Sequence, residues 1–149
     1  TGSVIPFFKR LLEKGKTELP ITDKRMTRFL ISLEESVDLI DWSFEHKNSH
    51  GKIIVPKLNS LKVTHLAKIL GKSYGINNIK LNYIGIRPGE KIHEEMVSLE
   101  ESLRTINYDK YFMITDEVIN EDAWSFASNT TIIPFENVED FLKEKKVIE

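Results

Sequence analysis

Short apolar segments of two different periodicities alternate along this chain, and this alternation is the feature that most limits the folds open to it. Residues 4–14 and 33–46 space their apolar side chains as amphipathic helices do. Residues 53–55 form a short apolar run, and residues 79–83 alternate apolar with polar side chains as a strand does. The pattern therefore predicts a mixed α/β domain over residues 1–149.

Local signals predict where several elements begin. Ser32 with Glu35, and Ser98 with Glu101, have the spacing of a capping box and indicate helix starts. Asn137 should cap the final helix. The pattern also predicts a helix from residue 61 or 63, a helix at 93–96 and a strand at 111–114. On the helix at 33–46, one apolar stripe is made of Leu33, Val37, Ile40 and Phe44.

Composition excludes several classes of protein. Apolar residues make up 40% and charged residues 30%, as in ordinary globular chains. No apolar run reaches the roughly 18 residues that a membrane span needs, and Lys9 and Arg10 interrupt any signal sequence. The absence of cysteine removes disulfides and thiol catalysis. With no membrane span, no signal sequence and no cysteine, we expect a cytoplasmic protein. A formal net charge of −2 gives no bulk attraction to nucleic acid or anionic lipid, so we expect neither as a partner.

The histidines offer little support for metal or acid–base chemistry. His46 and His50 have a spacing that could share a metal on a helix, but the residues between them are typical of a helix end. A solvated loop is the simpler interpretation. We expect His65 on the surface of its helix and His93 in a packed or exposed position near a ligand at most.

The usual cofactor motifs are absent. The chain has no Gly-x-Gly-x-x-Gly turn, no phosphate-binding Gly-x-x-x-x-Gly-Lys-Ser/Thr loop and no Tyr-x-x-x-Lys pair. We therefore expect no bound cofactor and no metal in this chain. Residues 60–71 look like the first half of a helix-turn-helix, but a strand pattern follows at residue 79, which argues against the DNA-binding alternative.

Arginines in two separate segments suit an anionic ligand. Arg25 and Arg28 shortly precede a capped helix, and Arg87 lies in a turn that needs both proline and glycine. The planar guanidinium fork matches phosphate oxygens, and Glu90 could accept hydrogen bonds from the vicinal hydroxyls of a ribose. The alternative interpretation is that these arginines pair with surface carboxylates.

Three motifs occur in order along the chain and together carry a resemblance to a known family. They are Gly-Ser-Val-Ile-Pro-Phe-Phe at 2–8, Pro-Ile-Thr-Asp-Lys-Arg-Met-Thr-Arg-Phe at 20–29 and Ile-Gly-Ile-Arg-Pro-Gly-Glu-Lys-Ile-His-Glu-Glu-Met at 84–96, with Ser128-Asn129 later in the chain. With these motifs the chain resembles the C-terminal half of inverting UDP-N-acetylglucosamine 4,6-dehydratases and of CapD/CapE-like polysaccharide biosynthesis enzymes. These are extended short-chain dehydrogenases/reductases.

The resemblance implies a fold and a site. The fold would be the C-terminal substrate-binding lobe of such an enzyme, lacking the N-terminal Rossmann domain, with residues 1–149 as a nucleotide-sugar (UDP-sugar) binding domain. Arg28 and Arg87 would clamp the pyrophosphate and Glu90 would bind the uridine ribose. Val4 and the stretch Pro20, Ile21 and Thr22 would lie near the uracil. Arg25 is a weaker candidate for substrate binding, with a structural role as the alternative.

The resemblance also implies what this chain does not supply. In the family the N-terminal half holds NAD(P) and the catalytic groups, so we expect no catalysis by this chain alone. Expected partners are a UDP-sugar, the Rossmann half or a separate chain carrying it, and further copies of this chain through an exposed apolar face. A non-catalytic nucleotide-sugar-binding or regulatory module is the alternative function.

Overall fold

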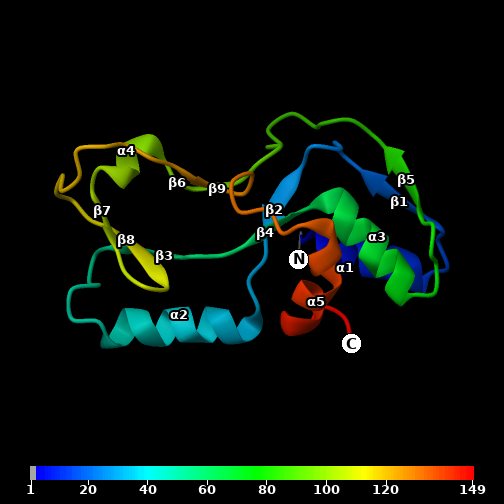
Figure 1. Cartoon of the computed structure of the whole chain (residues 1–149), viewed down its shortest axis with the longest axis horizontal. Coiled ribbons are helices and arrows are strands. Elements are labelled where there is room, and N and C mark those ends of the chain that lie inside the picture. The colour runs from blue at the N-terminus through cyan, green and yellow to red at the C-terminus, as the bar shows by residue number, and fades with distance from the viewer. Residues whose placement is uncertain (1–2) are drawn as a thin grey trace.

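The apolar periodicities resolve into short helices and strands in a computed structural model that describes residues 3–149. Gly2, the first residue of the motif at 2–8, lies outside the described residues. The chain forms two unequal parts arranged along its longest axis (Figure 1). The larger part contains α1 (Val4–Glu13), β1 (Glu18–Ile21), α3 (Val63–Ser73), β5 (Lys80–Tyr83) and α5 (Phe135–Glu144).

Two strands lie where the parts meet, β2 (Thr27–Phe29) and β4 (Ser60–Lys62). The smaller part contains α2 (Leu33–Glu45), β3 (Ile53–Pro56), β6 (Glu95–Val97), α4 (Leu99–Ser102), β7 (Thr105–Asn107), β8 (Tyr111–Ile114) and β9 (Phe126–Ala127). The chain therefore crosses between the parts several times, and each part is built from segments that are distant in sequence.

The strands form small separate sheets. β1 pairs in parallel with β5, while β2 pairs with β4 and β6 pairs with β9 in antiparallel fashion. The largest sheet among the described residues has three strands in the order β3-β8-β7. This architecture confirms the mixed α/β class and differs from a doubly wound sheet.

The main apolar core lies in the larger part. α3 carries an apolar stripe of Val63, Leu66, Ala67 and Leu70, which are all buried. They pack with Leu19 and Ile21 of β1 and with the apolar faces of α1 and α5. Each such large side chain contributes about 1.5–3 kcal/mol by leaving water. A smaller cluster of Val55, Val97, Ile114 and Phe126 supports the second part.

Capping hydrogen bonds are present at two of the predicted helix starts. Ser32 Oγ accepts from the Glu35 amide at 3.1 Å, and the Glu35 carboxylate accepts from the Ser32 amide at 2.8 Å. Ser98 and Glu101 form the same reciprocal pair at the start of α4. Both predicted capping boxes are thereby confirmed.

Two expectations about local structure were wrong. Residues 95–97 form strand β6 rather than a helix, because they pair with β9. α5 begins after Pro134, so Asn137 lies inside its first turn instead of capping it. The strand expected from residue 79 is confirmed as β5, so α3 is followed by a strand and not by the second helix of a helix-turn-helix.

Gly71 occupies a position in α3 where the next segment passes very close. A Cβ atom there would lie 2.9 Å from the Cβ of Ile79, which is buried in the core. Glycine at this position therefore permits α3 to pack against the start of β5.

We predict that Gly71→Ala destabilises the fold. The overlap with Ile79 costs about 1–3 kcal/mol, which outweighs the gain of up to about 1 kcal/mol from the helix propensity of alanine. Denaturant unfolding measures the difference, with Lys68→Ala on the exposed side of α3 as the control. A Gly71→Ala variant as stable as the control would contradict this close packing.

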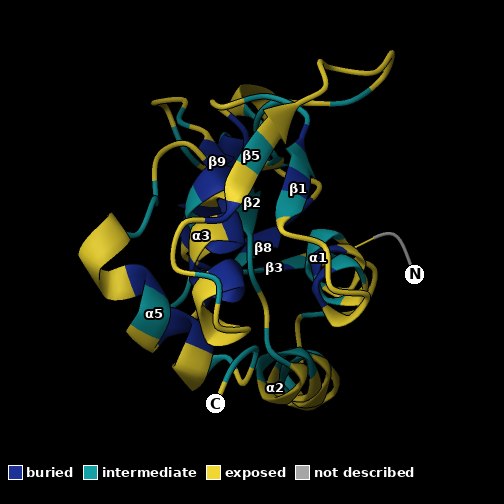
Figure 2. Cartoon of the chain, turned by 90° about the vertical axis from the view of Figure 1, so that its right-hand side faces the viewer, coloured by how far each residue is buried: buried dark blue, intermediate teal, exposed yellow. Residues whose placement is uncertain are grey.

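The apolar stripe of α2 lies at the surface. The exposed fractions are 82% for Leu33, 47% for Val37, 53% for Ile40 and 86% for Phe44, and α2 has no buried residue. Figure 2 shows α2 at the edge of the molecule, coloured mostly as exposed or intermediate. Glu34 and Glu35 in its first turn pair with Lys146 and Lys145, so α2 is held to the chain near α5 while its stripe faces outward. A contiguous exposed stripe of this kind favours association.

We predict that the isolated chain associates through this stripe. Leu33→Ser combined with Phe44→Ser should shift it toward monomer in sedimentation velocity, because the change removes the two most exposed side chains of the stripe. Val118→Ser, which removes another largely exposed apolar side chain outside α2, is the control. A wild-type chain that sediments only as a monomer would contradict the prediction.

Within the described residues, none of the helices has the length and apolar content needed to cross a bilayer.

Candidate functional site

A cavity of about 680 Å³ opens in the larger part of the molecule. Its walls come from α1, from β1, from β2 and from the segment that follows β5. Aliphatic and aromatic side chains form much of the lining. The polar side chains on its walls are Ser3, Arg10, Thr22, Arg28, Arg87, Glu90 and Glu94.

The segment after β5 forms one wall through a turn that depends on glycine. Gly85 and Gly89 have φ values of +85° and +81°, a conformation that other residues rarely adopt. The Ile84 amide donates to the Ile21 carbonyl at 2.9 Å, which starts the segment directly from the β1–β5 pair. The turn therefore carries Arg87 and Glu90 to the edge of the cavity.

Glu90 is tied to both sides of this wall. Its Oε1 accepts from Thr22 Oγ1 at 3.4 Å, and its Oε2 accepts from the Arg87 amide at 3.3 Å. Both contacts are long, so the carboxylate retains capacity to accept stronger hydrogen bonds from a ligand.

Arg28 is held by carbonyl groups of the backbone. Its Nη1 donates to the carbonyls of Thr27 at 2.7 Å and Ile92 at 3.0 Å, and its Nη2 donates to that of Lys91 at 2.8 Å. A guanidinium has five N–H groups, so two stay available, and Nε lies 4.0 Å from Glu94 Oε1. The side chain is 23% exposed, and the fork is thus oriented before any ligand arrives.

The structure brings most of the residues named from the sequence to one place. Those that line the cavity are Val4, Pro20, Thr22, Arg28, Arg87 and Glu90. Ile21 does not, because successive side chains of β1 alternate and Ile21 is fully buried in the core. Arg25 does not line it either, since its guanidinium folds onto Asp23 at 2.9–3.0 Å. That these residues bind a nucleotide stays a prediction.

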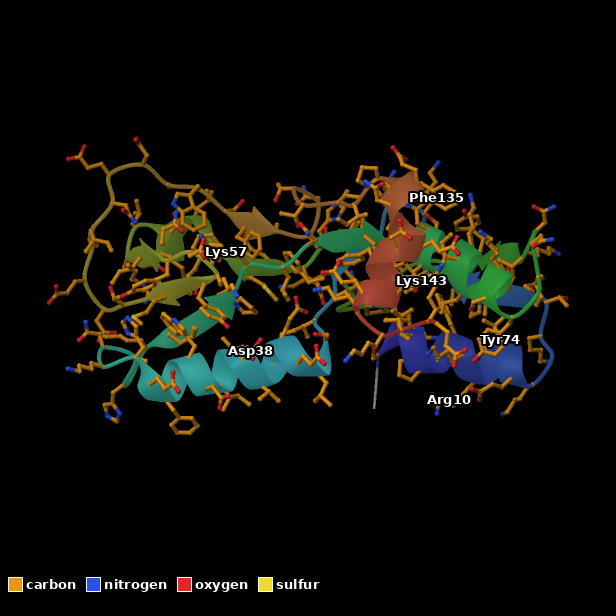
Figure 3. The ribbon with its side chains drawn as sticks, turned by 60° about the horizontal axis from the view of Figure 1, so that its bottom comes forward. Arg10, Asp38, Lys57, Tyr74, Phe135 and Lys143 are labelled. Carbon is orange, nitrogen blue, oxygen red and sulfur yellow. The ribbon has the colours of Figure 1, made fainter. Side chains whose placement is uncertain are left out.

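Sequence reasoning missed four residues on the α1 wall, which are Ile5, Phe7, Phe8 and Arg10. Phe7 and Arg10 line the cavity together with Val4, at intervals of three residues that place them along one side of the helix. The helical spacing from Val4 was the signal that could have identified them. Arg10 extends from the surface of α1 (Figure 3).

Electrostatically the cavity is suited to an anion with an apolar body. Three guanidinium groups, those of Arg10, Arg28 and Arg87, share its walls with the carboxylates of Glu90 and Glu94. Glu94 is already engaged, because its Oε2 accepts from the Phe29 amide at 2.8 Å. The positive groups can therefore meet an anion while one carboxylate remains to accept from hydroxyls.

The histidines take structural positions. The ring of His46 stacks on Trp42 with centroids 4.5 Å apart, and no cluster of three metal-ligating side chains occurs in residues 3–149. His65 is half-buried against Phe135 rather than fully exposed as expected, and burial lowers its pKa, as do the charges of Lys62 and Lys68.

The starts of the longer helices differ from that of a dinucleotide-binding fold. The longer helices α1, α2, α3 and α5 begin after Ser3, Ser32, Lys62 and Pro134, so none of them opens with a glycine-rich turn. Such a turn is what lets a pyrophosphate approach a helix N-terminus in dinucleotide-binding folds.

Comparison with known proteins shows the family of this chain. A family model described as "Polysaccharide biosynthesis protein" matches residues 1–116, and the chain belongs to that family. It is 45% identical over 117 residues to the UDP-N-acetylglucosamine 4,6-dehydratase (inverting) of Campylobacter jejuni strain 81-176, covering 78% of this chain and 33% of that protein. The resemblance to inverting dehydratases seen in the motifs is thereby confirmed.

Two other similarities extend over nearly the whole chain. The UDP-glucose 4-epimerase of Rickettsia akari is 39% identical over 156 residues, covering 95% of this chain and 45% of that protein. The crystal structure of Pen from Bacillus thuringiensis aligns with a TM-score of 0.82 at 25% identity, over 99% of this chain and 46% of that one. The chain thus spans between a third and a half of the length of these proteins.

We predict that removing the Arg25 side chain raises the pKa of Asp23. Hydrogen bonds from the Arg25 guanidinium and from the Arg25 amide hold that pKa at about 2, against an ordinary 3.8. In Arg25→Ala the amide still donates, so the pKa should rise only part of the way. A carboxyl ¹³C NMR titration measures it, and Lys24→Ala should have a smaller effect because Lys24 acts only through its charge. An unchanged Asp23 pKa in Arg25→Ala would show that the Arg25 side chain does not lower it.

Proposed function

We propose that this chain is the UDP-sugar-binding part of a nucleotide-sugar 4,6-dehydratase or 4-epimerase that acts in surface polysaccharide biosynthesis. The observation that carries the proposal is the meeting of Arg28, Arg87 and Glu90 on one cavity, although β2 and the segment after β5 are far apart in sequence. The relatives support the same class of substrate, because both are named for reactions of UDP-sugars.

Each wall of the cavity has a role in this proposal. The free N–H groups of Arg28 and the exposed guanidinium of Arg87 bind the diphosphate, for which a planar fork of donors is well suited. Glu90 accepts from the two ribose hydroxyls, replacing its long contacts to Thr22 and the Arg87 amide. Val4 and Pro20 form an apolar contact for the uracil ring.

The contribution of this chain to the reaction is orientation. Binding energy from the UDP group, remote from the reacting sugar carbons, fixes the sugar relative to the catalytic groups. NAD(P), which accepts and returns hydride in such reactions, has no fitting site in the described residues, so we assign it to the remainder of a complete enzyme. The identity of 45% to a UDP-N-acetylglucosamine dehydratase favours an N-acetylated UDP-hexose as the substrate.

We predict that Arg87→Ala weakens UDP binding by about 1.5–3 kcal/mol, because a charged hydrogen-bonding partner of the phosphate is lost. Isothermal titration calorimetry with UDP measures the change, and titrations with GMP and duplex DNA test the choice of ligand. Lys110→Ala removes the same charge from an exposed position in the smaller part and should leave the affinity unchanged.

Two results would oppose the proposal. An Arg87→Ala variant with the wild-type dissociation constant would remove Arg87 from the site. A wild-type chain that binds GMP or duplex DNA as tightly as UDP would remove the uridine nucleotide as the ligand.

A further inference from the structure

A chain of buried hydroxyl groups lies behind the cavity. Thr27 and Ser128 are 1% and 0% exposed, and their hydroxyl oxygens are 2.6 Å apart. Thr27 Oγ1 is also 2.6 Å from Nδ1 of His93, and Ser128 Oγ accepts from the Glu94 amide at 2.8 Å. Three segments that are distant in sequence therefore converge on one hydroxyl.

Either hydroxyl can donate in the contact between Thr27 and Ser128, and we assign the donor from the other contacts of each group. Because Ser128 Oγ accepts from an amide, its own proton goes either to Thr27 Oγ1 at 2.6 Å or to the Thr27 carbonyl at 3.4 Å. We assign donation to Oγ1, because it gives the Ser128 proton the shorter of its two bonds, and the Thr27 proton then goes to Nδ1 of His93. His93 is then the acceptor at the end of the chain, with its ring proton on Nε2.

The same segment of backbone also carries the site. The Thr27 amide and Arg28 Nη1 both donate to the Ile92 carbonyl at 3.0 Å, and the Ser128 amide donates to the Glu94 carbonyl at 2.8 Å. Residues 91–94 are thus joined to β2 and to Ser128 on both sides of His93. Arg87 and Glu90 lie only a few residues earlier on this segment.

We propose that His93 is a positioning residue for nucleoside diphosphate binding: by accepting from Thr27 at Nδ1, it fixes the segment that carries Arg87 and Glu90 on the cavity wall. This inference rests on the proposed function for its effect on affinity. Its effect on the segment itself does not depend on any ligand. His93 does not line the cavity, so its influence on binding passes through the residues it holds.

Two substitutions separate the hydrogen bond from simple packing. His93→Asn places an amide oxygen close to the position of Nδ1 and can still accept from Thr27, whereas His93→Leu fills similar space without an acceptor. Thr27→Val tests the same bond from the other end with little change in volume. Thermal melting checks that each variant folds.

We expect the Glu90 and Glu94 amides to exchange hydrogen about three- to tenfold faster in His93→Leu and Thr27→Val without ligand. UDP affinity should fall by a similar factor, and both quantities should return close to wild type in His93→Asn. In the wild-type chain, ¹⁵N NMR should show Nδ1 as the unprotonated nitrogen.

The outcomes distinguish the two proposals. Wild-type exchange rates in His93→Leu, or an equal loss in His93→Asn and His93→Leu, would overturn the positioning role of His93. A protonated Nδ1 would overturn it as well. If exchange behaves as expected while the wild-type chain fails to bind UDP, the positioning of the segment stands and the proposed function fails.

Discussion

The guanidinium of Arg28 is the interaction on which the arrangement of the cavity most depends. It donates to the carbonyls of Thr27, Lys91 and Ile92, and so it joins β2 to the segment that leads back from the turn at Gly85 and Gly89. One guanidinium thus accounts for hydrogen bonds to three backbone carbonyls. The same group presents its remaining N–H donors in a fixed direction. In the proposed function these donors bind the ligand, so one side chain both holds the backbone and contacts the ligand.

The stability of the site comes from the apolar core beneath it. Leu19 and Ile21 of β1 are fully buried against α3, while Pro20 between them faces the cavity. Alternation along one short strand therefore anchors one wall of the cavity in the core and exposes the opposite face of that strand to a ligand. The cavity belongs to the larger part, where most of the buried apolar residues lie.

The cavity and the exposed apolar stripe lie in different parts of the molecule. The larger part holds the cavity with its guanidinium groups, and the smaller part carries α2, whose apolar stripe is solvent-exposed. The comparisons match the chain to between a third and a half of the length of its relatives. The proposed function, in which the chain binds and orients a nucleotide sugar, uses the cavity and not the exposed stripe of α2.

The sequence by itself determined the elements whose signals are local. Both capping boxes, the stripe of α3 and the strand alternation before the turn at 87–90 appear where the sequence placed them, because caps and periodicity act within a few residues. The motifs also singled out Arg28, Arg87 and Glu90. Only the tertiary structure decided that residues 95–97 pair with β9 and that Ile21 faces the core. These outcomes depend on partners or packing that local spacing does not specify, and the hydroxyl chain from His93 through Thr27 to Ser128 is of the same kind.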